Sequence, residues 1–210
     1  GFKITPKLID GIFKACVWGD LLLSVTQRIR PYEINEGETN EVYDKWQRRL
    51  YNDIVKNNKS NLKLKRVTEE IIADFDAIPI DESVKKPKVG VVGEILVKFH
   101  PDANNDGVGV IESEGGEAVM PGLADFFLYC LYNSNFKYEN LGMKATTARL
   151  CNLAIIGVES YRKHARKLML ENPKFASRAP GHIAEIAEGA KNVLQLGHCT
   201  GEGWFLTGEM

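Results

Sequence analysis

Residues 88–94 read Lys-Val-Gly-Val-Val-Gly-Glu, and this short stretch decides the fold class. Its β-branched residues form an apolar run of the kind that is buried in a parallel sheet. A second run, Glu117–Met120, is stopped by Pro121-Gly122 and predicts another strand. Between the two, residues 108–111 indicate a brief crossover helix. Strand, helix and strand together predict one right-handed, Rossmann-like βαβ unit.

The stretch before this unit has a helical pattern. Apolar residues recur at spacings of three and four over residues 4–29, and Thr5-Pro6 predicts a cap and a first-turn proline. Pro31 should end that helix because the residue before a proline disfavours helical geometry. Two further helices are predicted over about residues 39–57 and 67–75. The polar run 57–61 between them predicts a loop.

The stretch after the second strand is again helical in pattern. Amphipathic segments cover residues 124–132, 144–170 and 182–196, and Gly197 is the expected C-cap of the last one. Helices therefore outnumber strands on both sides of the βαβ unit. We predict a helix-rich α/β fold.

The domain division follows from residues 83–87, which have the character of a linker. We predict a mainly helical subdomain over residues 1–84 and an α/β subdomain over residues 85–210. Two strands cannot make an independent sheet, so we expect a truncated parallel sheet whose remaining strands lie beyond Met210. Since the chain also begins with Gly1, we expect it to be part of a longer polypeptide.

Composition excludes several classes of protein. The 210 residues contain 27 Lys and Arg against 28 Asp and Glu, so the basic surplus of a nucleic-acid binder is missing. No apolar run approaches the roughly 20 residues that a membrane span needs, and residues 1–12 do not resemble a signal peptide. We expect a cytoplasmic protein without a nucleic-acid or membrane partner.

The four cysteines are scattered, at positions 16, 130, 151 and 199, and no CxxC pair is present. We expect them to be reduced and to fill space in the core. His198 and Cys199 are adjacent but lack further ligands at metal-binding spacing. We expect no metal site in this chain.

The loop after the first strand is the first candidate site, because ligands of open α/β sheets bind at the carboxyl ends of strands. Glu94 and His100 are its catalytic candidates, and the candidate substrate-binding residues are Gly93, Lys98, Asn104 and Asn105. The alternative is a polar surface loop with an Asx turn at residues 104–107. Neither GxGxxG nor a phosphate loop occurs here, so we expect no nucleotide site.

Glu202 is a third catalytic candidate, since Gly201 and Gly203 flank it and let the backbone approach another group closely. The competing interpretation is structural, because a carboxylate is also favourable at the start of a helix. We favour the structural interpretation slightly.

A group of charged and aromatic residues follows the first apolar helix: Asp20, Arg28, Arg30, Tyr32 and Glu33. One interpretation is a salt-bridged corner between domains, which we favour. The other is a site for an anionic group such as a CoA phosphate. Arginine suits both, because its planar fork binds carboxylate and phosphate alike.

Several motifs occur in order along nearly the whole chain. They are GDLL at 19–22, RIRPYE at 28–33, GET at 37–39, KVGVVGEI at 88–95, VKFHP at 97–101, Asn104-Asn105, ESEGGE at 112–117, PGL at 121–123 and TGEGWFLTGEM at 200–210. This series resembles the activase-related proteins of the 2-hydroxyacyl-CoA (2-hydroxyglutaryl-CoA) dehydratase system, the large CoA-substrate-specific enzyme activases of anaerobic bacteria.

The resemblance implies a much longer parent. Such proteins join ATPase activase modules of the actin-like sugar-kinase fold to a region related to the dehydratase subunits. ATP and a [4Fe–4S] cluster then drive a low-potential electron into the dehydratase. The cysteine-bearing QPFGC segment would lie beyond Met210, and none of the four cysteines matches it. The resemblance therefore implies no cofactor in this fragment and places the cluster and ATP in the parent.

The first hypothesis is a non-catalytic structural portion of such a parent, whose partners are the remainder of the chain, the activase module or dehydratase subunits, and acyl-CoA. The second is a docking or scaffold module for the activase or a partner dehydratase subunit. A free-standing small α/β enzyme is the third, and the lack of a nucleophile–base or phosphate-loop motif disfavours it.

Overall fold

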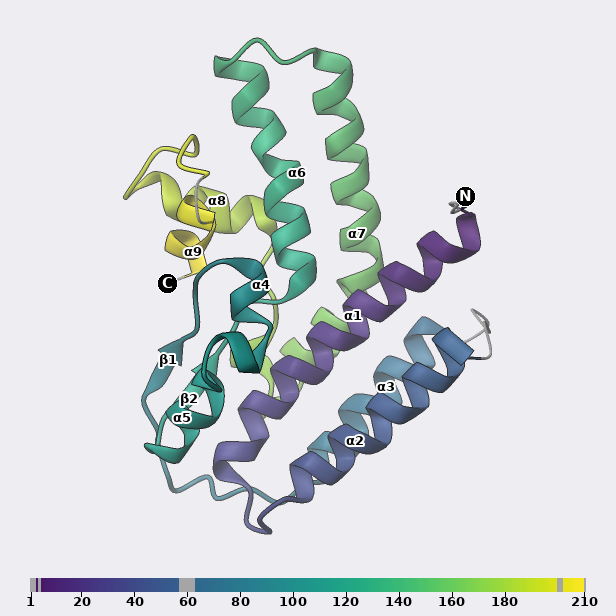
Figure 1. The fold of residues 1–210 in the computed structure, drawn as a ribbon, viewed down its shortest axis with the longest axis vertical. Helices are drawn as coiled ribbons and strands as arrows, with labels where there is room; N and C mark the ends of the chain where they lie inside the picture. Colours follow the sequence, from purple (N-terminus) through teal and green to yellow (C-terminus); the bar gives the residue numbers. More distant parts are fainter. Residues whose placement is uncertain (1–2, 4, 57–62, 200–201, 210) are drawn as a thin grey trace. The chain divides into compact units, whose positions relative to one another are not determined.

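The structure is a computed structural model that describes residues 3, 5–56, 63–199 and 202–209. It is 69% helical and contains a small two-stranded parallel sheet, as Figure 1 shows. The prediction of a helix-rich α/β fold is therefore confirmed at this coarse level. The predicted loop at 57–61 lies outside the described residues, as do Thr200, Gly201 and Met210 of the last motif.

The chain forms two compact units. Unit 1 consists of residues 1–88, 115–117 and 161–179, and unit 2 consists of residues 89–114, 118–160 and 180–210. The sequence suggested one continuous helical subdomain ending at residue 84. The structure instead returns the chain to unit 1 twice, because long-range packing rather than chain order decides which segments belong together.

Helix α1 (Pro6–Ile29) begins and ends where the sequence predicts. The Thr5 hydroxyl accepts a hydrogen bond from the Leu8 amide at 3.2 Å, and Pro6 occupies the first turn. This is favourable because the first amides of a helix have no partner within the helix. The helix gives way to the 3-10 turn η1 (Arg30–Tyr32), which contains Pro31.

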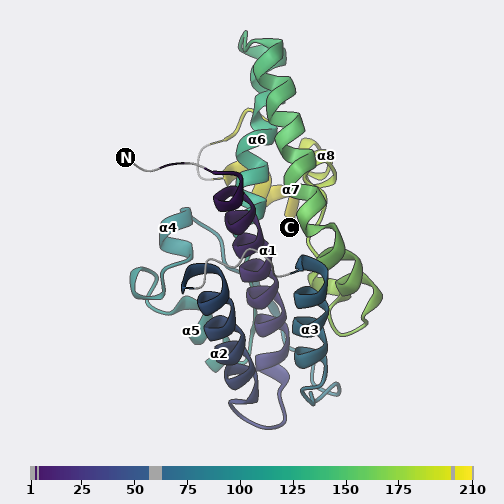
Figure 2. The same cartoon turned by 90° about the vertical axis from the view of Figure 1, so that its right-hand side faces the viewer.

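The core of unit 1 joins α1 to α2 (Glu38–Tyr51) and α3 (Leu64–Asp76), which Figures 1 and 2 show side by side. A π-helical turn, η2 (Asn52–Lys56), extends α2 to nearly its predicted end. Trp18 and Trp46 are almost fully buried, and the Trp18 indole donates to the Thr68 hydroxyl at 3.2 Å. Burial of large aromatic surfaces with a satisfied N–H is a major source of stability in such a core.

The segment after α3 is held against η1. Asp81 donates its amide to the Tyr32 carbonyl at 2.8 Å, and the Ile34 amide donates to the Pro79 carbonyl at 3.1 Å. Glu33 and Ile80 form an isolated antiparallel bridge between these segments. This pairing fixes the residues that follow Ile80 beside Tyr32.

Strands β1 (Lys88–Gly90) and β2 (Glu117–Val119) pair in parallel, as predicted. The connection between them contains α4 (Ile95–Lys98), the 3-10 turn η3 (Pro101–Ala103) and α5 (Gly107–Ser113). The prediction that β1 is buried is wrong, because all three of its residues are exposed. A β-branched run marks a strand but does not fix what covers it.

Besides α4 and α5, unit 2 contains α6 (Leu123–Asn140), the first part of α7 (Ala145–Glu171), α8 (Ile183–Lys191) and α9 (Gly203–Glu209). The last part of α7 and the turn η4 (Ala176–Arg178) belong to unit 1. An aromatic cluster joins α6 to α9: Tyr129, Tyr132, Trp204 and Phe205. A Cβ atom on Gly208 would lie 2.2 Å from the Ile186 carbonyl oxygen, so glycine is needed where α8 and α9 approach.

Three sequence predictions need correction here. Helix α8 ends at Lys191, well before the predicted residue 196. Gly197 is therefore not its C-cap; a Cβ atom there would lie 2.6 Å from the Phe136 ring, so close packing explains this glycine. None of the cysteines is fully buried, and Cys130 is exposed.

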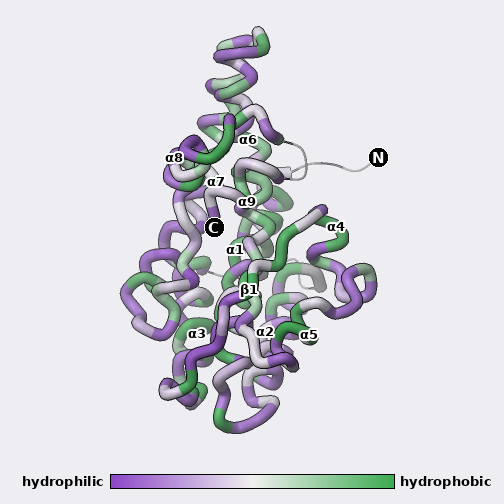
Figure 3. Tube along the Cα trace, turned by 90° about the vertical axis from the view of Figure 1, so that its left-hand side faces the viewer, coloured by the Kyte–Doolittle hydropathy of each residue, from purple (hydrophilic) through white to green (hydrophobic). Residues whose placement is uncertain are grey.

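Within the described residues, no helix combines the length and apolarity that crossing a bilayer requires. Figure 3 shows apolar and polar stretches alternating along the helices, and α4 and α5 are mostly apolar. Several of these apolar side chains are exposed, with Leu96 at 73% and Val110 at 54%. The connection between the strands thus leaves apolar surface uncovered within the described chain.

Candidate functional site

The two catalytic candidates in the loop after β1 are both exposed. Glu94 is exposed, and its carboxylate caps α4 by accepting a hydrogen bond from the Val97 amide at 3.0 Å. His100 is exposed as well. The side chain of Glu94 therefore has a structural partner, whereas the catalytic role of either residue stays a prediction.

Asn104 stabilises the loop in which it lies. Its amide nitrogen donates to the carbonyls of Val97 and Lys98, each at 3.0 Å, and its oxygen accepts from the Gly107 amide at 3.0 Å. Asn105 has a positive φ of 55° and is exposed, and Gly93 has a φ of 137°. The Asn104 oxygen thus bonds the amide three residues on, not two as in an Asx turn. Substrate binding by these residues stays a prediction.

Two other candidates, Lys98 and Glu202, meet although 104 residues separate them. The Lys98 ammonium lies 3.0 Å from Oε2 of Glu202, and the side chains are 0% and 4% exposed. Lys98 is the last residue of α4, and Glu202 immediately precedes α9. A charge this deeply buried needs an opposite charge beside it, which each residue provides for the other.

The Glu202 carboxylate is only half satisfied. Its Oε1 atom is buried and has no hydrogen-bond partner among the described residues. The backbone of Glu202 is left-handed, with a φ of 61°, which is uncommon for a residue with a side chain. Burial raises the pKa of the nearby Cys130 thiol, and the charge of Glu202 raises it further. The free oxygen can accept a hydrogen bond or a proton.

A second buried ion pair lies in unit 1, and all its members are satisfied. Oε1 of Glu117 lies 2.7 Å from Nη2 and 2.9 Å from Nε of Arg178, and Oε2 accepts from the Tyr32 hydroxyl at 2.6 Å. Burial raises the pKa of Tyr32, and its hydrogen bond to Glu117 raises it further. Burial lowers the pKa of Arg178, and the pair with Glu117 opposes that shift.

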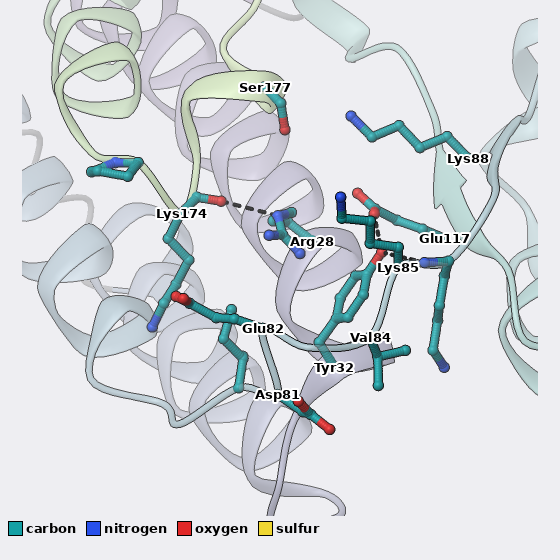
Figure 4. A pocket seen from close by; sticks show the side chains of 13 residues that line it. Arg28, Tyr32, Asp81, Glu82, Val84, Lys85, Lys88, Glu117, Lys174 and Ser177 are labelled. Atoms are coloured by element: carbon teal, nitrogen blue, oxygen red, sulfur yellow. Dashed lines mark hydrogen bonds between the residues drawn. The ribbon is translucent and has the colours of Figure 1, made fainter.

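Beside this ion pair, unit 1 contains a pocket of about 510 Å³, drawn in Figure 4. It lies between the end of α1, the segment after α3, the start of β2 and the turn after α7. Its lining consists of Arg28, Tyr32, Ile80, Asp81, Glu82, Val84, Lys85, Lys86, Lys88, Glu117, Pro173, Lys174 and Ser177.

Arg28 and Tyr32 are the two members of the predicted charged group that line this pocket. Arg30 instead donates to the Asn40 side chain at 3.3 Å. Glu33 accepts from the amides of Gly37 and Thr39, each at 2.8 Å, and so holds the start of α2. Arg28 and Tyr32 of this group therefore line the pocket, whereas Glu33 caps the start of α2. Both interpretations of Arg28 and Tyr32 remain predictions.

The sequence did not single out Glu117, Arg178 or Lys174 as site residues. Glu117 carried a weak signal, because a carboxylate in a short apolar strand needs a partner if it is buried. Arg178 and Lys174 lie between the helical segments predicted over residues 144–170 and 182–196, where the sequence gives no helix or strand pattern. Their positions depend on the packing of the turn after α7, which no local pattern reports.

No family model, curated protein or solved structure matches this chain. Among the residues that the structure describes, no group of three or more His, Cys, Asp or Glu side chains is placed to hold a metal ion. A [4Fe–4S] cluster is commonly held by four thiolates. No such set of thiolates is gathered among the residues that the structure describes.

Proposed function

We propose that the chain is an internal, non-catalytic portion of a large ATP-dependent, [4Fe–4S]-linked activator or dehydratase-like protein of the 2-hydroxyacyl-CoA dehydratase system. In that parent, which we place in the cytoplasm, other segments supply the cluster ligands and the ATP site. The parent transfers electrons to CoA esters or takes part in their dehydration. The two-stranded sheet is then the start of a larger, Rossmann-like sheet completed by strands elsewhere in the parent.

One observation carries this proposal: the motifs that resemble the family bind one another. Glu33 of RPYE holds Gly37 and Thr39 of GET. In the same unit, Tyr32 of RPYE donates to Glu117, the last residue of ESEGGE.

In unit 2, Lys98 of VKFHP pairs with Glu202 of TGEGW. The contact of Glu33 is local, whereas the pairs Tyr32–Glu117 and Lys98–Glu202 join segments that are 85 and 104 positions apart. A set of motifs whose functional groups are engaged with one another supports a structural role more than a catalytic one.

The test uses the full-length parent and two conservative variants. Glu94→Gln keeps an oxygen that can cap α4, and His100→Asn keeps a polar side chain at an exposed position. We expect ATP-coupled electron transfer and CoA-ester turnover to stay within about twofold of the unmodified parent, since surface changes of this kind cost little. A fall of tenfold or more in either variant, with folding intact, would contradict a non-catalytic role.

Two further measurements address the parent itself. Anaerobic treatment of the 210-residue chain with iron and sulfide should give none of the visible absorption of thiolate-bound iron. Sequencing of the complete gene should show a cysteine-bearing segment after the TGEGW motif and actin-like ATPase motifs before residue 1. A cluster held by this chain, or a gene without those segments, would contradict the proposal.

The second candidate function is a docking module for the activase or a partner dehydratase subunit. Its support is an apolar stripe on α7, where Leu150, Leu153 and Ile156 are 67%, 64% and 64% exposed. Exposed apolar side chains at helical spacing are typical of a protein-binding face. Replacement of all three by serine should abolish capture of the isolated activase portion. Undiminished capture would rule out this face.

A further inference from the structure

The pocket of unit 1 has the dimensions and the lining of a ligand site. Its volume of about 510 Å³ falls within the range of roughly 300–1,000 Å³ that is usual for small-molecule sites. Four separate segments supply polar groups to it, together with the apolar side chains of Ile80, Val84 and Pro173. Neither the pocket nor its charge depends on the parent protein proposed above.

The charge of the pocket is positive although the whole chain has a net charge of −1. Five of its lining residues are Arg or Lys, and three are Asp or Glu. One of those carboxylates, Glu117, is already neutralised by Arg178. Lys85 and Lys88 are exposed, and neither forms an ion pair within the described chain. Cations without counter-ions around a cavity favour an anionic ligand.

Arg28, which lines this positive pocket, has an unused donor. Its Nε donates to the Lys174 carbonyl at 3.0 Å, and its guanidinium lies 4.7 Å from the centre of the Tyr32 ring. Figure 4 accordingly shows Arg28 between Lys174 and Tyr32. Its Nη1 atom is buried and has no hydrogen-bond partner among the described residues. A buried, charged donor without a partner is unfavourable because it has lost its hydrogen bonds to water. An acceptor that reaches it therefore adds a hydrogen bond without displacing an existing one.

The neighbouring contacts hold Arg28 in place for such an acceptor. The Lys174 ammonium donates to the carbonyls of Asp76 and Ile78 at 2.6 and 3.0 Å, which fixes the residue whose own carbonyl holds Arg28. On the other side, Tyr32 is held by its hydrogen bond to Glu117. A positioned guanidinium loses little conformational entropy on binding a planar pair of anionic oxygens.

We propose that this pocket binds a phosphorylated ligand through a diphosphate or phosphate-ester group. The free Nη1 of Arg28 donates to a phosphoryl oxygen, and Lys85 and Lys88 supply positive charge at the rim. A phosphate ester or diphosphate carries more charge and more acceptor oxygens than a single carboxylate, and several cations are grouped here. Arginine recognises phosphate by its fork, and lysine as a point charge.

Calorimetry with inorganic pyrophosphate at low ionic strength tests the site in the 210-residue chain. We expect saturable binding of one pyrophosphate per chain, weaker binding of orthophosphate and the weakest binding of succinate. Succinate that binds as tightly as pyrophosphate would overturn the choice of a phosphoryl group. Absence of saturable pyrophosphate binding at millimolar concentration would overturn the site.

A matched pair of double variants distinguishes binding of pyrophosphate in this pocket from its nonspecific attraction to a positively charged surface. Lys85→Gln with Lys88→Gln removes two exposed charges at the rim, and we expect binding to weaken about tenfold. Lys7→Gln with Lys65→Gln removes two exposed charges elsewhere in unit 1 and should leave binding unchanged. Equal weakening in both double variants would show that pyrophosphate does not use the pocket.

A third variant tests Arg28 itself. Arg28→Lys keeps the positive charge but loses the second donor arm, so pyrophosphate binding should fall at least about fivefold. Circular dichroism of the same sample reports whether unit 1 stays folded, because Arg28 also holds the Lys174 carbonyl. A folded Arg28→Lys protein that binds pyrophosphate as tightly as the unmodified chain would overturn the assignment of Arg28.

Discussion

Two buried ion pairs among the described residues differ in how completely they are satisfied. In unit 1, Glu117 uses both carboxylate oxygens, one toward Arg178 and one toward Tyr32. In unit 2, Glu202 uses one oxygen toward Lys98 and leaves the other without a partner among the described residues. A fully satisfied pair specifies a structure, whereas an incompletely satisfied pair has capacity left for a ligand or a proton.

The backbone adds to this contrast. Glu117 lies in the regular strand β2, whereas Glu202 holds a left-handed conformation just before α9. A side chain in that conformation carries a local cost that the surrounding contacts must offset. The same residue thus combines a buried charge, an unused acceptor and an unfavourable backbone. Among the sequence candidates, Glu202 is the one whose environment distinguishes it most from an ordinary surface carboxylate.

The largest expected effect comes from breaking the satisfied pair. Glu117→Gln leaves the Arg178 guanidinium buried without a negative charge, and arginine cannot lose its proton to escape that cost. We expect the free energy of unfolding to fall by about 3–5 kcal/mol. Urea unfolding followed by circular dichroism measures it. Glu82→Gln, an exposed carboxylate of the neighbouring pocket, is the control and should change stability by less than about 0.5 kcal/mol.

Breaking the incomplete pair should cost less. Glu202→Gln leaves Lys98 buried, but an ammonium can be deprotonated, so we expect a loss of about 2–3 kcal/mol in the same urea experiment. Lys98→Met in that background removes the stranded charge and should restore more than half of the loss. A double variant as unstable as the sum of the two single variants would show that the two residues are not coupled.

How far the sequence predicts these pairs depends on the range of the contacts involved. The boundaries of α1 follow from Thr5, Pro6 and Pro31, because caps and prolines act locally. Lys98 and Glu202 were both candidates, yet no local pattern could show that they meet across 104 residues. Arg178 carried no signal at all. Local chemistry fixes the elements, and only long-range packing decides which polar groups become partners.

Removal of the Tyr32 hydroxyl tests how much its hydrogen bond to Glu117 adds to the stability of the Glu117–Arg178 pair. Tyr32→Phe deletes the hydrogen bond to Oε2 of Glu117 and should lower the free energy of unfolding by about 1.5 kcal/mol, the lower end for hydrogen bonds to charged groups. The value is at the lower end because water from the adjoining pocket can replace the hydroxyl. Tyr43 packs against the same core, and its hydroxyl has no hydrogen bond within the described residues. Tyr43→Phe should therefore be nearly neutral, and an equal loss in both variants would show that Glu117 does not require Tyr32.

The smallest effect reports whether the charge of Glu202 acts on the Cys130 thiol. Burial raises the pKa of the Cys130 thiol, and the negative charge of Glu202 raises it further. Because the thiolate is the reactive form, Glu202→Gln should lower that pKa and speed alkylation of Cys130 roughly twofold at pH 8.

Mass spectrometry of the Cys130 peptide after timed treatment with iodoacetamide measures the alkylation rate. The alkylation rate is expected to rise and not to fall, because loss of a nearby negative charge favours the thiolate. Glu139→Gln removes a carboxylate from the same helix, α6, and should leave the rate unchanged. If Glu202→Gln also leaves it unchanged, then the charge of Glu202 does not act on Cys130, and the contrast between the two buried pairs would rest on their partners alone.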